Sequence, residues 1–171
     1  MLEKDFNTMV VASLNKSGYG YKIPDMFSQS TGMRSKAPFD GFGFFMDSNG
    51  IGHPVYFESK YLPQPKSFPI SRFEPHQQES LQKAYSVLGD NAIAILLICV
   101  AFSSRDKRVF FWMNEDLDEF VPRREGKKNI LKKEFEQRTN YVKVSRGEID
   151  FNEILNTRNF RNFNNLEEEE K

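Results

Sequence analysis

The sequence predicts an α/β domain in which helices flank a mixed β-sheet. Apolar residues recur at helical spacing over residues 2–15 and 74–88. Residues 91–102 are apolar without alternation, as expected of a central strand that is covered on both faces. Residues 42–60 have the pattern of two strands around a turn, which predicts a β-hairpin. Helices and strands in this arrangement pack as layers around a core.

The length fits one domain. A chain of 171 residues is long enough for one substantial core and short for two domains. We expect that domain to span residues 1–160, followed by an acidic, disordered tail over residues 161–171. The net charge is +0, from 24 basic and 24 acidic residues, but the tail contains the acidic run from Glu167 to Glu170. The body without the tail is therefore basic.

The composition indicates neither a secreted nor a membrane protein. Cys99 is the single cysteine and lies inside an apolar run, so we expect a core residue rather than a nucleophile. No signal peptide is recognised, and the longest apolar run, residues 92–102, is well short of the ~20 residues that cross a bilayer. We therefore expect a cytoplasmic protein with no membrane partner.

The N-terminal region predicts a helix. Phe6, Val10 and Leu14 follow helical spacing, and residues 17–20 carry a stop signal with two glycines. Glu3 falls in the first turn, where a carboxylate complements the helix dipole. Spacing alone gives Glu3 no further role.

A short strand over residues 19–23 and a mobile loop up to residue 36 should follow. Three basic residues lie in this interval, Lys22, Arg34 and Lys36. From such a loop they could contact DNA phosphates, and they equally fit ordinary solvated charges.

The hairpin contains the residues on which the functional hypothesis depends. Its strands are residues 42–46 and 55–60, and residues 47–50 have turn chemistry. Side chains alternate between the faces of a strand, so Glu58 and Lys60 lie side by side on one face.

If strand pairing brings Asp40 opposite Glu58, two carboxylates meet beside Lys60. Mg²⁺ is usually held by one or two carboxylates together with waters and substrate phosphates. This arrangement suggests phosphodiester hydrolysis, in which Lys60 stabilises the developing negative charge or orients the attacking water. The spacing also fits an exposed ion pair between Glu58 and Lys60, with Asp40 as a turn residue.

A second helix should begin at Glu74 and Pro75 and end at Gly89, after an extended segment over residues 61–73 that prolines interrupt. We expect one face of this helix to cover the sheet, and it contains Gln77, Leu81, Ala84 and Leu88.

Gln77 would then point inward at the N-terminal end of the helix. A buried amide needs hydrogen-bond partners, which either a polar active site or the core backbone supplies. His76 is displaced from this face and is expected at the rim.

The strand over residues 91–102 should turn into a partner strand over residues 109–113. We expect Phe111 and Trp112 on the partner strand to pack in the core or at its edge rather than to stack on DNA bases.

Beyond it, Asn114 is expected to cap a helix over residues 115–120 that Pro122 ends. The remaining predicted elements are a basic loop, a helix at 132–137, a strand at 141–144 and a helix to about residue 160, capped by Asp150 and Glu153.

Positive charge is concentrated in the basic stretch, which is a candidate surface for DNA phosphates. A solvated loop and helix face would explain it equally well. Its cationic residues are Arg123, Arg124, Lys127, Lys128, Lys132 and Lys133.

Together these residues resemble the RecU-type Holliday-junction resolvases, a branch of the PD-(D/E)xK nuclease superfamily. The resemblance combines Asp40, Glu58 and Lys60 with further segments in the order of the family. These segments are LEKDFN at residues 2–7, SFP at 67–69, FEPHQ at 73–77, REGKKNI at 124–130 and KKEF at 132–135. The resemblance covers roughly residues 2 to 155.

The resemblance implies a restriction-endonuclease-like fold and a homodimeric endonuclease that depends on Mg²⁺, with Mn²⁺ as a substitute. Such an enzyme nicks two strands of a four-way DNA junction symmetrically during recombination and repair. A recombinase or a branch-migration motor would be a further partner.

The resemblance also implies roles for individual residues. Asp40 and Glu58 belong to the metal site, together with Ser59, which lies between Glu58 and Lys60. Lys60 is the catalytic lysine. Glu3 is an additional helix carboxylate, and Gln77 is the polar residue that follows the core motif. The DNA-contact candidates are Lys22, Arg34, Lys36, His76 and the six cations of the basic stretch.

Two features depart from the family pattern. Only residues 22–36 occupy the interval in which family members have a long basic stalk. Phe39 and Gly41 directly flank Asp40 and suggest a different local turn. A compact, phage-encoded resolvase would explain both features. The alternatives are an endonuclease for forks, flaps or duplex DNA and a non-catalytic protein that binds junctions and modulates recombination.

Overall fold

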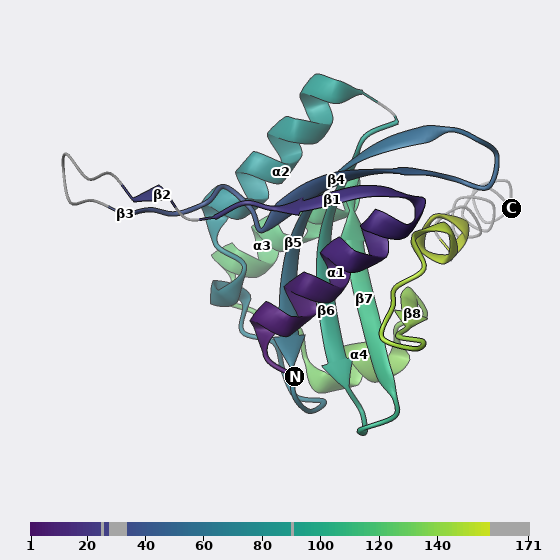
Figure 1. The fold of residues 1–171 in the computed structure, drawn as a ribbon. Coiled ribbons are helices and arrows are strands. Elements are labelled where there is room, and N and C mark those ends of the chain that lie inside the picture. The colour runs from purple at the N-terminus through teal and green to yellow at the C-terminus, as the bar shows by residue number, and fades with distance from the viewer. Residues whose placement is uncertain (25, 28–33, 90, 158–171) are drawn as a thin grey trace, which may run out of the picture.

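The computed structural model describes residues 1–24, 26–27, 34–89 and 91–157. Its centre is a six-stranded sheet with the strand order β1-β4-β5-β6-β7-β8 and with helices on both faces (Figure 1). This arrangement confirms the predicted α/β class. The strands of this sheet are β1 (Gly18–Lys22), β4 (Gly41–Met46), β5 (Gly52–Leu62), β6 (Ile93–Ala101), β7 (Lys107–Met113) and β8 (Tyr141–Lys143).

The sheet is mixed. β5 and β6 run parallel, whereas the other neighbouring pairs are antiparallel. All 9 residues of β6 are buried, as predicted for a central strand. Phe111 and Trp112 on β7 are also buried, which confirms their expected place in the core. Cys99 is a core residue as predicted, and burial raises the pKa of its thiol to about 12.

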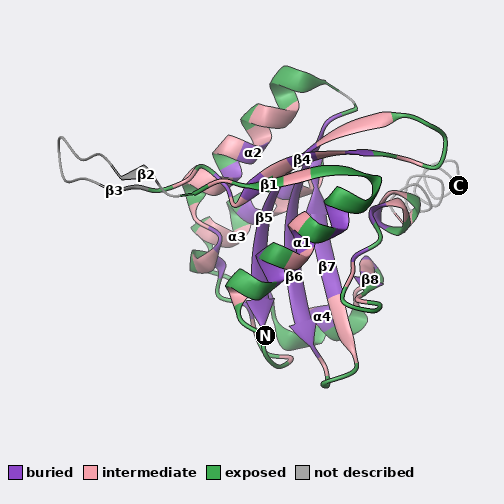
Figure 2. Ribbon diagram, in the orientation of Figure 1, coloured by how far each residue is buried: buried purple, intermediate pink, exposed green. Residues whose placement is uncertain are grey.

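Two apolar cores lie on opposite faces of the sheet. On one face, α1 (Glu3–Ser17) and the helical residues 151–157 contribute to the first core. On the other face, α2 (Pro75–Leu88), α3 (Phe120–Glu125) and α4 (Lys132–Gln137) contribute to the second. Figure 2 shows the buried central strands between these layers. The chain therefore forms a helix–sheet–helix sandwich.

β4 and β5 form the predicted hairpin, but β5 is longer than expected. It spans Gly52–Leu62 rather than residues 55–60. Its pairing with β4 ends where Gly41 lies opposite Phe57. The segment after β5, predicted to be extended, contains the short 3-10 helix η1 (Ile70–Arg72).

The interval between β1 and β4 contains a short two-stranded sheet, which the prediction of a mobile loop did not include. β2 (Met26–Phe27) pairs antiparallel with β3 (Arg34–Ser35), and this pairing satisfies backbone groups that a loop would leave to water. The small sheet projects away from the main body (Figure 1). The remaining part of the predicted mobile loop, residues 25 and 28–33, lies outside the described residues.

A short helix forms close to the predicted range 115–120, as the 3-10 helix η2 (Asn114–Glu119), but the predicted capping role of Asn114 was wrong. Asn114 has a φ of 54° and is buried, with its side chain bonded to the amide of Ala94 and the carbonyl of Ala92 at 2.9 and 3.2 Å. It therefore holds β6 rather than capping a helix.

Pro122 does not end a helix. The 3-10 helix η2 (Asn114–Glu119) is followed by α3, in which Pro122 is the third residue. The amides of the first turn have no partner within a helix, so proline is tolerated there. Consequently Arg123 and Arg124 are helical and do not belong to a loop.

The C-terminal part follows the prediction as far as it is described. Residues 151–157 are helical, and the carboxylate of Asp150 accepts hydrogen bonds from the amides of Asn152 and Glu153 at 2.8 and 3.2 Å. Asp150 is thus the cap, whereas Glu153 lies inside the helix. Residues 158–160 of the predicted helix and the tail at 161–171 lie outside the described residues. No helix in the described part of the chain is long and apolar enough to cross a membrane.

Candidate active site

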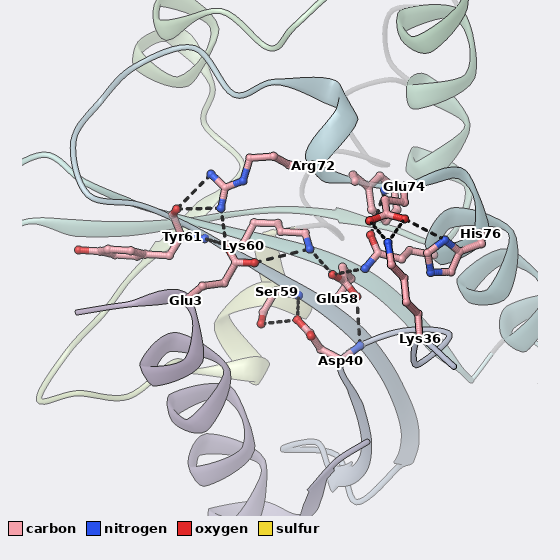
Figure 3. Close-up of polar contacts among 12 residues, drawn as sticks. Glu3, Lys36, Asp40, Glu58, Ser59, Lys60, Tyr61, Arg72, Glu74 and His76 are labelled. Carbon is pink, nitrogen blue, oxygen red and sulfur yellow. Dashed lines mark hydrogen bonds and ion pairs between the residues drawn. The ribbon is translucent and has the colours of Figure 1, made fainter. Parts of the chain in front are cut away.

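The candidate site lies where β5 continues past the end of β4. Residues 58–62 of β5 pair with β6 on one side, while the β4 pairing has already ended at Phe57. Backbone groups along the open edge of a strand need other partners. Here those partners are the side chains of Asp40, Glu3 and Arg72 (Figure 3).

Asp40 is held at this open edge by Ser59. Its Oδ2 accepts hydrogen bonds from the amide and the hydroxyl of Ser59, both at 2.8 Å. Gly41, the next residue, must be small because a Cβ there would lie 2.5 Å from both the Phe57 ring and the Tyr21 carbonyl oxygen. The close approach of three strands thus explains the glycine that departs from the family pattern.

Glu58 meets Asp40 directly, so the condition on which the two-carboxylate hypothesis depended is met. The Asp40 amide donates to Glu58 Oε2 at 3.1 Å. Glu58 is buried, and this burial, followed by the nearby negative charge of Asp40, raises the pKa of Glu58 to about 7. A cation shared by the two carboxylates would relieve both unfavourable effects.

Lys60 lies beside Glu58 on the same face of β5, which confirms the alternation argument. Its ammonium donates to Glu58 Oε1 and lies 3.7 Å from Glu3 Oε1. Burial lowers the pKa of Lys60, but the Glu58 carboxylate more than offsets this, so the pKa lies above its ordinary value. Lys60 is therefore a fixed positive charge. The pair is buried and does not match the exposed ion pair considered above.

Gln77 points into the site. Its Nε2 donates to Glu58 Oε1 at 2.7 Å, and its Oε1 accepts from the Glu74 amide at 2.9 Å. The second bond belongs to the capping box at the start of α2. The predicted sheet-facing residues were only partly right: Leu81 is buried, whereas Leu88 is 47% exposed because the end of α2 extends beyond the sheet.

Glu3 reaches the same place from the first turn of α1. Its Oε2 pairs with Arg72 and accepts a long hydrogen bond of 3.4 Å from the Tyr61 amide. Arg72 also donates from both terminal nitrogens to the Tyr61 carbonyl oxygen at 3.3 Å. Glu3 thus belongs to the site through Lys60 and Arg72, which a helix-end position alone did not indicate.

The donor set fits a hard divalent cation held by few protein ligands. No group of three histidine, cysteine, aspartate or glutamate side chains in the described ranges forms a metal cluster. Asp40 and Glu58 are two adjoining oxygen donors, which is the number that Mg²⁺ commonly takes from a protein. The amide and hydroxyl of Ser59 both donate to Asp40, so its carbonyl oxygen is the Ser59 group suited to a metal.

Of the DNA-contact candidates from the first half of the chain, Lys22, Lys36 and His76 lie around this site, and Arg34 does not. Lys36 donates to both carboxylate oxygens of Glu74, at 2.8 and 2.9 Å. His76 Nδ1 lies 3.4 Å from Glu74 Oε2, and its half-exposed ring confirms the predicted rim position. Lys22 is exposed at the end of β1, opposite Gly41. Arg34 lies in β3, away from the main body.

The basic stretch divides into two kinds of residue. Arg123 bridges Glu119 and Glu134 at 2.7 and 2.6 Å. Arg124 has internal partners too, Gln78 at 2.7 Å and the Phe73 carbonyl oxygen at 3.0 Å. These two arginines therefore brace α3 against neighbouring elements. The exposed cations of the stretch are Lys127, Lys128, Lys132 and Lys133.

Arg72 and Glu74 were not predicted to be site residues from the sequence. Glu74 could have been found, because an acidic residue three positions before a glutamine at a helix start is a capping-box pattern. Arg72 gave no such signal, because its contacts depend on a 3-10 turn that brings residues distant in sequence together.

A mixed sheet with helices on both faces, carrying two carboxylates and a lysine at the open end of one strand, defines a domain of the restriction-endonuclease-like fold. The model of the RecU family, described as recombination protein U, matches residues 12–157. The chain therefore belongs to the RecU family, and this membership implies a Holliday-junction resolvase with a role in recombination. No curated protein matches the chain.

The family match covers Asp40, Glu58, Lys60 and Gln77, as well as the basic stretch. It begins after Glu3 and the rest of the LEKDFN segment. The inclusion of Glu3 in the site therefore rests on its contacts with Lys60 and Arg72.

Proposed function

We propose that this protein is a Mg²⁺-dependent endonuclease that resolves four-way DNA junctions by paired symmetric nicks in recombination and repair. The observation that carries the proposal is the direct meeting of Asp40 and Glu58 at the open edge of β5, with Lys60 bonded to Glu58. A protein that only binds DNA has no need for two carboxylates near a phosphate.

Asp40 and Glu58 are the proposed side-chain ligands, with the Ser59 carbonyl as a further ligand. When bound, Mg²⁺ supplies charge neutralisation at the scissile phosphate and activation of water, and Mn²⁺ should substitute for it. Ser59 orients Asp40 through two hydrogen bonds, and Gln77 orients Glu58 through one.

Lys60 stabilises the negative charge that develops on the phosphate oxygens, or orients the attacking water. Its contact with Glu58 fixes its position before substrate arrives, which removes a reorganisation cost from the reaction. Glu3 assists by holding the ammonium from the other side, at 3.7 Å.

DNA would reach this site across a basic rim. Lys22, Lys36 and His76 lie on one side of it, with Arg34 on the projecting β2–β3 sheet. The basic stretch would contribute through its exposed lysines. Arg123 and Arg124 would contribute their charge while keeping their internal bonds. A two-fold symmetric junction suits a two-fold homodimer, and a recombinase or branch-migration motor would be its partner in the cell.

The test is cleavage of a synthetic four-way junction with Mg²⁺, compared at one salt concentration with a fork, a flap and a linear duplex. We expect Asp40→Asn and Glu58→Gln each to lower the rate by about 10³-fold, because each removes a charge from the proposed metal site. Asp47→Asn is the matched control, since Asp47 makes turn contacts at the other end of β4.

Full activity of Asp40→Asn would overturn the site. Junction binding without turnover in Mg²⁺ or Mn²⁺ would support a non-catalytic modulator instead. Equal cleavage of all substrates would support the second candidate, a nuclease for forks, flaps or duplex DNA. That candidate is favoured by one observation, the short interval that holds β2 and β3 between β1 and β4.

A further inference from the structure

Arg72 is a charged residue beside the candidate site to which the proposed mechanism gives no role. It lies on η1, and its guanidinium pairs with Glu3 Oε2. Glu3 in turn lies 3.7 Å from the ammonium of Lys60. The chain of contacts therefore runs from Arg72 through Glu3 to the proposed catalytic lysine (Figure 3).

We propose that Arg72 is a positioning residue of the nuclease, which acts through Glu3 to hold Lys60 in its reactive orientation. This inference rests on the proposed function. It adds a residue that no sequence pattern marked as functional, and it assigns Glu3 an indirect role rather than a place among the metal ligands.

Glu3 needs such support because it is poorly restrained by itself. Its side chain is 42% exposed, and an exposed carboxylate at 3.7 Å from an ammonium gains little from that contact. Ordering the long glutamate side chain costs a similar or larger amount of conformational entropy. Without a second partner, Glu3 would spend much of its time away from Lys60.

Arg72 can provide that restraint because it is itself anchored. Both of its terminal nitrogens donate to the Tyr61 carbonyl oxygen at 3.3 Å. Its guanidinium lies 5.4 Å from the centre of the Phe68 ring. Phe68 is fully buried and exchanges backbone hydrogen bonds with Ile130 at 2.8 and 3.1 Å. A planar guanidinium can make these contacts at once, whereas the ammonium of a lysine cannot.

The position of Lys60 depends on the balance between its two carboxylates. Glu58 draws the ammonium toward the buried end of the site, and Glu3 draws it toward the half-exposed end. If Glu3 is released, Glu58 alone restrains the Lys60 ammonium, which should then lose the second carboxylate that directs it toward the half-exposed end of the site and a phosphate. Arg72 therefore affects the chemical step without touching the substrate.

The experiment is a double-mutant cycle on the full-length chain with Arg72→Ala, Glu3→Gln and the combined variant. Single-turnover nicking of a four-way junction measures the chemical step, and junction binding in EDTA measures affinity. We expect each single variant to nick about 10-fold to 100-fold more slowly, as for other residues that orient a catalytic group. The combined variant should be no slower than the slower single variant, because both remove the same support.

Two further variants separate positioning from stability. Arg108→Ala is the matched control: Arg108 also pairs with a carboxylate, Asp106, and lies over the rings of Phe102 and Tyr141, but these contacts are on β7 and its surroundings. It should lose stability and retain its nicking rate. Arg72→Lys keeps the charge but loses the planar guanidinium with its several donors, so its nicking rate should stay below half of the wild-type rate.

An unchanged rate for Arg72→Ala would overturn the inference, as would losses that multiply in the combined variant. A loss that follows junction affinity alone would instead make Arg72 a DNA-contact residue. Failure of the wild-type protein to nick any junction would overturn the proposed function, a result distinct from all of these.

Discussion

The two halves of β5 have different neighbours and contain different kinds of side chain. Residues 52–57 pair with β4 along their length, and residues 55–57 pair with β6 as well, so neighbouring strands satisfy much of their backbone. Residues 58–62 have lost β4, and side chains take its place at the open edge. In the first half, Val55 and Phe57 pack into the apolar core. In the second half, Glu58 and Lys60 are buried as a charged pair.

This difference shows how a buried strand can hold charged groups. Burial of a carboxylate or an ammonium is costly unless each is paired and hydrogen-bonded. Glu58 receives bonds from Lys60, Gln77 and the Asp40 amide, which provide that compensation. The end of the neighbouring strand creates the space in which these partners converge. The candidate site is thus a consequence of unequal strand lengths.

The largest effect that the comparison predicts is on stability, in the paired half. Phe57→Ala should lower the free energy of unfolding by about 3–5 kcal/mol, because a fully buried ring is replaced by a cavity. Urea unfolding of the variant and of the wild type measures the change. Glu58→Gln, at the next position, should alter stability much less than cleavage. If Phe57→Ala instead reduced cleavage with stability intact, the division of β5 would be incorrect.

The adjacent residues Gln77 and Gln78 allow a site contact to be compared with a core contact on the same helix. Gln77 contacts Glu58, whereas Gln78 is buried and bonds to the Leu117 carbonyl oxygen at 2.9 Å and to Arg124 at 2.7 Å. Gln77→Ala should slow nicking by about 10-fold to 100-fold with little loss of stability. Gln78→Ala should lower the unfolding free energy by about 1–3 kcal/mol, because it leaves buried groups unpaired. Rates corrected for the folded fraction decide the matter, and equal rate losses would contradict the assignment.

The smallest predicted effect concerns the ion pair between Asp106 and Arg108, which lies at the start of β7, two strands away from β5. Hydrogen bonding from Arg108 lowers the pKa of Asp106, against a smaller opposing effect of burial. A carboxylate with a lowered folded-state pKa stabilises the protein above its unfolded pKa of about 3.9, and this stability is lost as pH falls through the folded pKa.

Asp106→Asn should therefore lower the unfolding free energy by at most about 1 kcal/mol at neutral pH, because the pair is partly exposed. The difference from wild type should shrink in urea titrations below the unfolded pKa, and the nicking rate should not change. A difference that grows in acid would show that the sign of this linkage is wrong.

Much of the site could be predicted from the sequence because it depends on local geometry. Strand alternation alone placed Glu58 beside Lys60, and turn chemistry predicted the hairpin, whereas the meeting of Asp40 with Glu58 stayed a condition that the strand pairing had to meet. Helical spacing directed Gln77 inward, although the same argument wrongly buried Leu88. Asn114 and Pro122 were misassigned because their roles depend on contacts with β6 and on their position within a helical turn.

The sequence by itself determined the layered α/β class, the central buried strand and the carboxylate–lysine pair, because periodicity fixes which side chains share a face. Only the tertiary structure decided that β5 extends beyond the end of β4 and that Arg72 and Glu3 meet there. It also decided that Arg123 and Arg124 bond to neighbouring elements. These features join residues far apart in the chain, and their geometry depends on how the whole sheet and its helices pack. A local pattern contains no information about where a neighbouring strand will end.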